Sequence, residues 1–561
     1  MKTAYFRIHE EDNVAIALEQ LEPGCEIQFT GGGCMAAEVI PRGHKVALSD
    51  LEPGQDVIKY GYPIGHATKR VRAGSWVHSH NMCTNLEGTL EYEYRPSYSV
   101  RAGEQGAPGV MVPAGMPGAV APAGMPGAAA PAGMPGAVAP AGMPGAAAPA
   151  GTAGAAAPAG TAALARLSPA PSGPTFKGYR RKNGAVGVRN EIWIIPTVSC
   201  ANHTADVLAK LASVEFGDAC DGIFAFPHNS GCSQLGDDHR MTQKLLAAIA
   251  KHPNAGGVLL VSLGCENNNI HEFLPVLGDY DRDRFRVLVT QEAGDEIGTG
   301  LELLRELAEI VKRDKRVRVP VSELKIAFKC GGSDSLSGVT ANPLCGTVAD
   351  RITSLGGSAV LTEVPEMFGA ETILMNRADS RETFEKVVNL INSFKQYYLD
   401  YGQPVYENPS PGNKEGGITT LEEKSLGCVQ KGGRAVVSDT LDYGEPVRRP
   451  GLNLMTGPGN DNVSITDLVA SGAQILLFTT GRGNPLGTAI PCIKLSSNTA
   501  LYERKRHWID FNAGTIVDGD SLEKLSEKLW KLVLEVASGK KTRSEINGFR
   551  EIMLFKNGVL L

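Results

Sequence analysis

Hydrophobic and polar residues alternate in two different ways along the 561-residue chain. Up to residue 98, short alternating runs such as CEIQF, HKVAL and DVIKYG are separated by Gly, Pro and Asp. This pattern predicts a small all-β module. From residue 177 onward, apolar runs such as IWIIPTVSC and GGVLLVSLGC alternate with stretches of helical periodicity such as TADVLAKLASV. Near-continuous apolar strands between helices predict a layered α/β body with largely parallel sheets.

A change of composition separates these two parts. Residues 99–176 are mostly Ala, Gly, Pro and Met, and the unit PAGMPGAVA or PAGMPGAAA recurs from Pro113 onward. Every third triplet lacks the Gly that a collagen triple helix requires at its axis. We therefore predict a disordered linker with no chemistry of its own, the alternative being a tether for a partner. The expected domains are 1–98 (β module), 99–176 (linker), 177–320 (first α/β domain) and 321–561 (second α/β domain).

Charge, hydropathy and cysteine usage narrow the classes of function. The net charge of -6 gives no basic field for nucleic acid, and no apolar run is long enough to predict a membrane span. The N-terminus lacks a signal-peptide core, so the eleven cysteines, which include no C-x-x-C pair, are expected to be reduced thiols in the cytoplasm. Neither a G-x-G-x-x-G turn that opens a helix nor a phosphate-binding loop occurs, which argues against NAD and NTP.

The first candidate site lies in the β module. Trp76–Asn81 reads as a strand, and alternate residues of a strand face the same side, so His78 and His80 are expected to point together. Two imidazoles at this spacing can bind one metal ion, although such a pair is also common as plain polar surface. His44, Lys45 and Lys59 belong to the same module and can converge with them on a carboxylate substrate.

The second candidate site is the set of loops that follow the predicted parallel strands, where ligands of open α/β sheets bind. Three of these loops carry a cysteine beside glycine and an amide or acidic residue, at Cys232, Cys265 and Cys330. Their thiolates can hold an iron–sulfur cluster with one open iron. Alternatively, imidazoles and carboxylates hold a single ferrous or manganous ion while the cysteines only pack. The scattered cysteine spacing favours the single ion.

A third candidate is the stretch NPSPGNKEGGITT, which spans residues 408–420. Its Pro, Gly, Asn and Ser content predicts a long ordered loop, which is a frequent location for functional groups. Its amides, hydroxyl groups and Lys414 can surround a polyhydroxylated acid. The alternative is an ordinary connector.

Longer motifs resemble a known family. RGHKVALSDLEPGQDVIKYGYPIGHA and VHSHN look like the SAF module of the altronate and galactarate dehydratases. SGCSQLGDDH, CGGSDSLSGVTANP, TEVPEMFGAE and NPSPGNKEGGITTLEEKSLGC resemble the body of the same family. The resemblance covers residues 1–98 and 177–561, and TGRGNP looks closer to the altronate branch. The repeat linker departs from the family, whose members join the two parts by a short connector.

This resemblance implies a hydro-lyase that removes water from D-altronate and gives 2-dehydro-3-deoxy-D-gluconate in hexuronate breakdown. It also implies a requirement for Fe(II), or Mn(II) in some members. Galactarate or another sugar acid is the alternative substrate, and a non-catalytic sugar-acid-binding protein is the alternative class. Homo-oligomerisation is left open.

The roles of individual residues follow as hypotheses. We expect His78 and His80 to bind metal or substrate, Lys45 or Lys59 to be the general base, and His44 to be the acid. The expected substrate ligands are Asn81, Lys414, Thr419 and Arg482. The active site is then expected between the β module and the α/β body.

Overall fold

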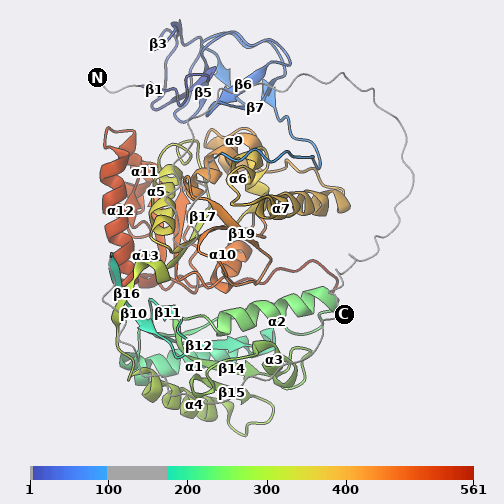
Figure 1. Cartoon of the computed structure of the whole chain (residues 1–561), viewed down its shortest axis with the longest axis vertical. Coiled ribbons are helices and arrows are strands. Elements are labelled where there is room, and N and C mark those ends of the chain that lie inside the picture. The colour runs from blue at the N-terminus through green and yellow to red at the C-terminus, as the bar shows by residue number, and fades with distance from the viewer. Residues whose placement is uncertain (1–3, 98–172) are drawn as a thin grey trace, which may run out of the picture.

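The computed structural model describes residues 4–97 and 173–561. Figure 1 shows the β module in blue at one end, the 173–320 region in green at the other, and the C-terminal region from yellow to red between them. The repeats of the predicted linker, residues 98–172, lie outside the described residues. Among the described helices, none is both long enough and apolar enough to cross a lipid bilayer.

The β module consists of short antiparallel strands in three small sheets, ordered β1-β2-β5-β8, β3-β4 and β6-β7-β9. Their bounds are β1 (Tyr5–Phe6), β2 (Val14–Ala17), β3 (Glu26–Phe29), β4 (Gly32–Met35), β5 (Lys45–Ala47), β6 (Asp56–Lys59), β7 (Tyr62–Ala67), β8 (Trp76–Val77) and β9 (Met82–Cys83). After β9 the chain continues without regular structure to Ser97 along the C-terminal region. The predicted all-β module is confirmed.

The region after the linker contains a parallel sheet in the order β13-β12-β14-β15 and a small antiparallel sheet, β11-β10-β16. Its strands are β10 (Thr175–Arg180), β11 (Val186–Gly187), β12 (Glu191–Pro196), β13 (Ile223–Ala225), β14 (Ala255–Ser262), β15 (Phe285–Val289) and β16 (Val317–Pro320). Its helices are α1 (Asn202–Phe216), α2 (Gly236–Ala250), α3 (Ile270–Leu277) and α4 (Glu296–Val311). Helices α1 and α4 share one apolar core with the parallel sheet.

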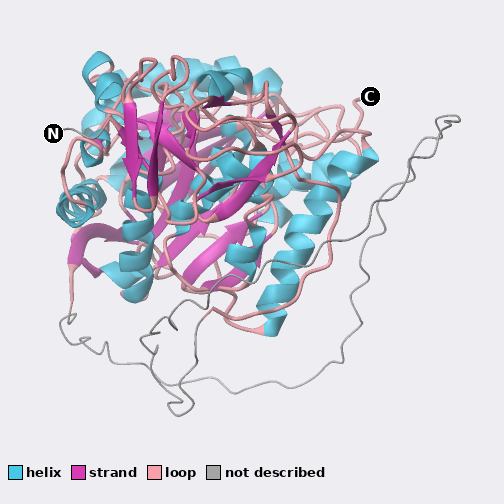
Figure 2. Ribbon diagram, turned by 90° about the horizontal axis from the view of Figure 1, so that it is seen from above, coloured by secondary structure: helices cyan, strands magenta, loops and turns pink. Residues whose placement is uncertain are grey.

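The C-terminal region is built on a seven-stranded parallel sheet in the order β19-β20-β18-β17-β21-β22-β23. Its strands are β17 (Lys325–Cys330), β18 (Ser358–Leu361), β19 (Val437–Leu441), β20 (Gly451–Met455), β21 (Ile475–Thr480), β22 (Cys492–Ser496) and β23 (Phe511–Asn512). Its helices are α5 (Ala341–Ser354), α6 (Glu371–Met375), α7 (Arg381–Asp400), α8 (Pro411–Glu415), α9 (Leu421–Cys428), α10 (Asp461–Ala470), α11 (Thr499–Arg504), α12 (Leu522–Ala537) and α13 (Arg543–Ile546). Helices cover both faces of this sheet, as the view from above shows (Figure 2).

The parallel α/β body confirms the predicted fold class. Buried strands such as β12 and β21 are apolar along almost their whole length, because helices cover both of their faces. The parallel arrangement also brings the carboxyl ends of neighbouring strands to one edge, where the functional loops begin.

Candidate active site

The β module and the C-terminal region meet at a buried charge cluster. Glu423, on α9, accepts hydrogen bonds from Lys59 Nζ on β6 at 2.6 Å and from Lys45 Nζ on β5 at 2.8 Å. All three side chains are at most 1% exposed. Two predicted catalytic lysines therefore do converge, but on a carboxylate from the other part of the chain. Whether either one acts as a base stays a prediction.

Burial and mutual attraction set the ionisation of this cluster. Burial lowers the pKa of Lys45 to about 8, although Glu423 opposes this effect. For Lys59, burial also acts to lower the pKa, but the attraction of Glu423 outweighs it and raises the pKa. Burial alone would raise the pKa of Glu423, yet the two ammonium groups lower it. The carboxylate is therefore ionised and holds both strands against α9.

The start of α9 places Glu423 accurately. The Thr420 side chain accepts a hydrogen bond from the Glu423 amide as an N-cap and donates one to Ile64 O of the β module at 2.5 Å. Thr419 donates to Glu423 Oε2 from its amide at 2.9 Å and from its hydroxyl at 2.7 Å. Thr419, an expected substrate ligand, thus orients the carboxylate in this structure, and its contact with substrate stays a prediction.

The predicted strand through the two histidines is shorter than expected. Strand β8 ends at Val77, and His78–Asn81 form a turn in which the His78 amide donates to Asn81 Oδ1 at 2.9 Å. The expectation that His78 and His80 alternate on a strand is therefore wrong. The reason is that Asn81 also donates to Trp76 O at 2.8 Å, so its side chain closes the turn in place of strand pairing.

The imidazoles nevertheless gather around Trp76. The rings of His78 and His80 lie 5.4 and 5.3 Å from the Trp76 ring, and His44 lies 5.1 Å from His78. His44 contacts Glu415 O at 3.3 Å and His78 contacts Lys414 O at 3.0 Å, both at the end of α8. Burial, followed by repulsion from His78 and Lys45, lowers the pKa of His44 to about 4, so it is neutral near pH 7. The roles of these histidines as acid or ligands stay predictions.

Two other expected substrate ligands contact neighbouring segments of the chain. Arg482 pairs with Glu415 Oε2 at 2.9 Å on the surface, where the arginine side chain is 44% exposed. The carbonyl group of Lys414 contacts His78, as described above. Their contact with substrate, like that of Asn81, stays a prediction.

A second buried cluster, at the C-terminal end of α9, contains two thiols and a carboxylate. Cys330 Sγ, at the end of β17, lies 3.5 Å from Cys428 Sγ, at the end of α9. Glu366 Oε2 lies 3.2 Å from the first sulfur and 3.1 Å from the second. Among the residues that the structure describes, these three form the group whose metal-binding atoms all lie within 4.8 Å of one another.

Three lysines surround this thiol–carboxylate group. Lys431 Nζ donates to Cys330 Sγ at 3.0 Å, and Lys424 Nζ lies 2.9 Å from Glu366 Oε1. Lys329 pairs with Glu363 and, at 2.8 Å, with Asp461 Oδ1. A hydrogen bond from the Cys428 thiol is the main cause that lowers the pKa of Cys330, and the lysines act in the same direction. The Cys330 thiolate is therefore available near neutral pH.

This group opens into a cavity of about 570 Å³ at the carboxyl edge of the seven-stranded sheet. Its polar lining side chains are Cys330, Ser333, Glu366, Asn408, Ser410, Asn413, Lys424, Asn460, Asp461, Asn462 and Asn484. Among the described residues that line it, Lys424 is the single cationic side chain. The lining also carries two carboxylates, Glu366 and Asp461, and Lys424 already pairs with Glu366. With a cation that offsets these carboxylates, one ammonium group and several amides would suit a ligand with one carboxylate and several hydroxyl groups.

The three cysteines proposed as one thiolate set lie on two different sheets. Cys330 is the last residue of β17 in the seven-stranded sheet, whereas Cys232 and Cys265 follow β13 and β14 of the four-stranded sheet. Cys330 is buried and the other two are exposed. The sequence does not show which of these cysteines share a sheet, because the loops after the strands have similar compositions in both sheets.

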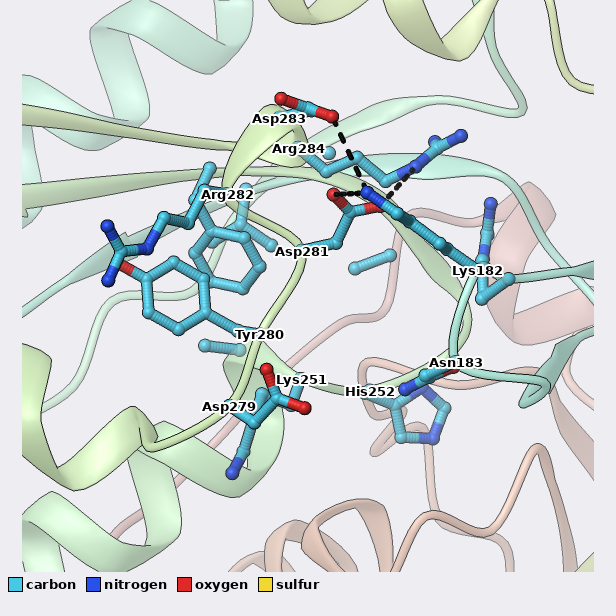
Figure 3. Close-up of a pocket in the computed structure, with 16 residues that line it drawn as sticks. Lys182, Asn183, Lys251, His252, Asp279, Tyr280, Asp281, Arg282, Asp283 and Arg284 are labelled. Atoms are coloured by element: carbon cyan, nitrogen blue, oxygen red, sulfur yellow. Dashed lines mark ion pairs between the residues drawn. The ribbon is translucent and has the colours of Figure 1, made fainter. Parts of the chain in front are cut away.

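Another cavity, of about 510 Å³, lies at the amino ends of β14 and β15 (Figure 3). Its charges largely pair with one another. Lys182 lies 3.8 Å from Asp281 and 3.9 Å from Asp283, and Arg284 lies 3.7 Å from Asp281. Because parallel sheets bind ligands at the opposite edge of their strands, we do not regard this cavity as the active site.

Several residues of the site were given no individual role from sequence, namely Glu363, Glu366, Glu423, Lys424, Cys428, Lys431 and Asp461. The available signal was α9 itself, in which LEEKSLGC is buried at every position despite three charged residues. Charged residues are almost never buried unless they are paired. Sequence does not reveal this burial, because the same letters would suit an exposed helix.

Comparisons with known proteins cover nearly the whole chain. Residues 3–85 match the altronate/galactarate dehydratase SAF domain, residues 178–312 the second domain of D-galactarate dehydratase/altronate hydrolase, and residues 321–560 the C-terminal domain of D-galactarate/altronate dehydratase. The altronate dehydratase of Bacillus subtilis (strain 168) is 43% identical over 561 residues, 100% of both chains. The altronate dehydratase of Escherichia coli (strain K12) is 42% identical, over 99% of this chain and 100% of its own. The galactarate dehydratase (L-threo-forming) of Escherichia coli (strain K12) is 29% identical, over 96% and 93% of the two chains.

Proposed function

Because this chain belongs to the altronate/galactarate dehydratase family, we propose that it is an altronate dehydratase whose substrate binds in the cavity beside Cys330 and Glu366. The observation that carries this location is the single lysine among many amides in the cavity lining. Altronate has one carboxylate and a chain of hydroxyl groups. Galactarate has a second carboxylate, which would need a cationic partner of its own.

The reaction requires loss of the C2 proton and of the C3 hydroxyl group. Lys424 binds the substrate carboxylate, and the asparagine amides bind the hydroxyl chain. Asp461 is our candidate for the group that accepts the C2 proton, since it lines the cavity as a carboxylate held by Lys329 and by Asn484 Nδ2 at 2.8 Å. In this proposal Lys45 and Lys59 act as positioning residues, because they hold the helix that carries Lys424.

The metal expected for this family fits the buried thiol–carboxylate group. Two sulfur donors and one carboxylate oxygen suit Fe(II) better than Mn(II), which prefers oxygen donors. The lowered pKa of Cys330 favours the thiolate that a metal needs as a ligand, whereas the hydrogen bond to Cys330 raises the pKa of Cys428, so a metal would have to displace the Cys428 proton. Held by Cys330, Glu366 and Cys428, a divalent cation would act as a Lewis acid that stabilises negative charge on the substrate carboxylate during proton loss.

Steady-state formation of keto acid from altronate and galactarate, after anaerobic addition of Fe(II) or Mn(II), tests the proposal. We expect turnover of altronate to exceed that of galactarate, and Fe(II) to support it better. Asp461→Asn should lower kcat about 100-fold with little change in KM, and Lys424→Met should lower kcat/KM roughly 10–100-fold. Lys325→Met, at the other end of β17, is the control. Faster turnover of galactarate, or full activity of both cavity variants, would contradict the proposal.

A further inference from the structure

Three exposed cysteines stand apart from the other cysteines of the chain. Cys200, Cys232 and Cys265 are exposed, whereas the remaining eight are buried or half-buried. Cysteine is among the most buried residue types, so exposed thiols that gather in one region require an explanation. None of the three lines the cavity beside Cys330 and Glu366.

All three thiols follow neighbouring strands of the four-stranded sheet. Cys200 lies just after β12, Cys232 after β13 and Cys265 after β14. Strand β12 pairs in parallel with both β13 and β14, so the three carboxyl ends lie side by side at one edge of the sheet. This sheet lies in the green region of Figure 1, at the opposite end of the molecule from the β module.

Hydrogen bonds join the three loops directly beside the cysteines. The Ser199 amide donates to Ser230 O at 2.9 Å, which links the Cys200 turn to the Cys232 loop. The Asn268 amide donates to Gly231 O at 3.0 Å, and the Ser233 amide donates to Asn267 Oδ1 at 2.8 Å. These two bonds link the Cys232 loop to the Cys265 loop.

A buried carboxylate and a glycine make this arrangement rigid. Glu266 accepts hydrogen bonds from Thr197 Oγ1 at 2.7 Å, from Ser262 Oγ at 2.6 Å and from the Gly264 amide at 2.6 Å. Gly231 has a φ of +104°, and a Cβ atom there would overlap Thr197 O, so only glycine allows this close approach. The cysteines are therefore presented on loops fixed before any ligand binds.

The three exposed sulfurs are not gathered as closely as the ligands of a single ion. Tetrahedral zinc, with Zn–S bonds of about 2.3 Å, would bring its sulfur ligands to about 4 Å from one another. Within the described residues the metal-binding atoms that lie so close are those of Cys330, Glu366 and Cys428, and not those of the three exposed thiols. In an iron–sulfur cluster, by contrast, each thiolate binds a separate iron atom.

We propose that Cys200, Cys232 and Cys265 bind a four-iron, four-sulfur cluster at the carboxyl edge of the four-stranded sheet. Three thiolates leave one iron without a protein ligand, so that iron is open to water or to a hydroxy acid. Gln291 Nε2 donates to Cys265 Sγ at 3.3 Å, a contact of the kind that tunes cluster sulfur ligands. The site retains two members of the thiolate set expected from sequence and replaces Cys330 with Cys200. It does not depend on the proposed dehydratase cavity.

Anaerobic reconstitution of the full chain with ferric iron, dithiothreitol and sulfide tests this site. We expect about four acid-labile sulfides and four cluster iron atoms per chain, beside the single ion proposed at the Cys330 group, together with a broad brown absorbance and a paramagnetic signal after reduction. Cys200→Ser, Cys232→Ser and Cys265→Ser should each lose most of this content. Cys220→Ser, a half-buried cysteine of the same region, and Cys330→Ser should retain it. Unchanged iron and sulfide in the triple variant, or loss in Cys330→Ser instead, would overturn the proposal.

Alkylation of the wild-type chain provides a measurement that needs no substitution. With iodoacetamide and peptide mass spectrometry, the three thiols should react readily in the apo protein and be protected after reconstitution. Equal labelling of all three in both states would also overturn the proposal. Dehydratase assays of the same samples separate this result from the cavity proposal, since Cys330→Ser should lose activity while it keeps the cluster.

Discussion

Glu423 compensates two buried ammonium groups at once, and this residue holds the β module against the body. Removing a charge from water is strongly unfavourable unless a partner and hydrogen bonds compensate it. Lys45, Lys59 and Glu423 meet this condition through contacts of 2.6 and 2.8 Å, supported by Thr419. The cluster therefore tolerates the loss of one member poorly.

Glu423→Gln should destabilise the protein by about 3–5 kcal/mol, because it leaves two buried ammonium groups without a counter-charge. Urea unfolding followed by circular dichroism measures the change, and keto-acid formation should fall in parallel. Glu415→Gln, which breaks the exposed pair with Arg482, should change stability by less than about 1 kcal/mol. Equal stability of the two variants would show that the cluster does not hold the two parts together.

Two buried histidines, His228 and His252, should make stability depend on pH. Burial lowers the pKa of His228 to about 4 and that of His252 to about 3, and each Nε2 donates to a carbonyl group while Nδ1 accepts from an amide. The unfolded chain protonates histidine near pH 6.5. Between about pH 6.5 and pH 4 the unfolded state therefore binds more protons, and the free energy of unfolding falls as pH falls.

We expect each of these histidines to remove roughly 2–3 kcal/mol of stability at pH 4 relative to pH 7. Urea unfolding of wild type and His252→Gln at several pH values measures this, and the variant should show a shallower decline. His271→Gln, at an exposed position, should keep the wild-type slope. If the free energy of unfolding fell with pH at the same slope in all three proteins, His252 would not be a buried imidazole that stays neutral in the folded state.

Prediction from sequence succeeded for some site residues and failed for others for a physical reason. His44, Lys45, Lys59 and His78 were expected to converge, and they do lie at the interface between the β module and the body. Glu423, the partner of Lys45 and Lys59, lies more than 360 positions from either lysine in the chain. Long-range pairing of charges leaves no periodic signal in one sequence, so the carboxylate was missed.

At the level of elements, α9 approaches its neighbours through glycine. Gly427 on α9 faces Gly338, and a Cβ atom on Gly338 would overlap the Tyr60 hydroxyl of the β module and lie 2.9 Å from Gly427 Cα. The helix, the loop after β17 and the β module therefore meet at a point with no room for a methyl group. Such packed contacts resist added volume.

Gly338→Ala should cost about 1–3 kcal/mol and lower activity, because the added methyl group pushes α9 and Tyr60 apart next to the charge cluster. Gly217→Ala, whose added Cβ meets no atom within 4 Å, is the matched control and should be close to neutral. Thermal unfolding and keto-acid assays of both variants measure the difference. Unchanged stability and activity of Gly338→Ala would mean that the neighbouring atoms move aside for the methyl group without strain.

Elements with strong patterns could be predicted from sequence, and weakly patterned ones could not. The apolar face of α12 (Leu522–Ala537) repeats regularly, so the sequence indicates this helix. Strands β20 and β22 give a weaker signal, because GLNLM and CIKLS carry Asn453 and Lys494 inside buried strands. Backbone carbonyl groups accept hydrogen bonds from both side chains, Arg449 O and Gly451 O from Asn453 and Asn484 O and Leu486 O from Lys494, and the sequence pattern does not record these contacts.

On the scale of the whole molecule, the β module is attached by much more than the linker. Residues 84–97 continue along the C-terminal region, with Thr84 bonded to Glu422 at 2.7 Å, Tyr92 to Glu371 at 2.6 Å and the Arg95 amide to Asn376 at 3.0 Å. Together with the buried lysines, these contacts should hold the two parts together even when the covalent connection is cut.

Co-expression of residues 1–97 and 173–561 as separate polypeptides should therefore yield a stable complex. We expect an affinity tag on one fragment to retain the other, and the complex to form keto acid at a rate close to that of the intact chain. The same pair with Glu423→Gln is the control and should associate weakly, because the buried lysines lose their partner. Failure of the wild-type fragments to copurify would assign an essential role to residues 98–172.

The antiparallel pair of β10 and β16 also determines how mechanical tension passes through the chain. Thr175 pairs with Pro320 where the 175–320 region begins and ends, so these two points are neighbours across one ladder. A pull applied to the chain on either side of this region loads the ladder from its open end, one hydrogen bond after another. Under such a pull, the β10–β16 ladder would separate at low force. The parallel sheet of the green region in Figure 1 would bear no load until this ladder has separated.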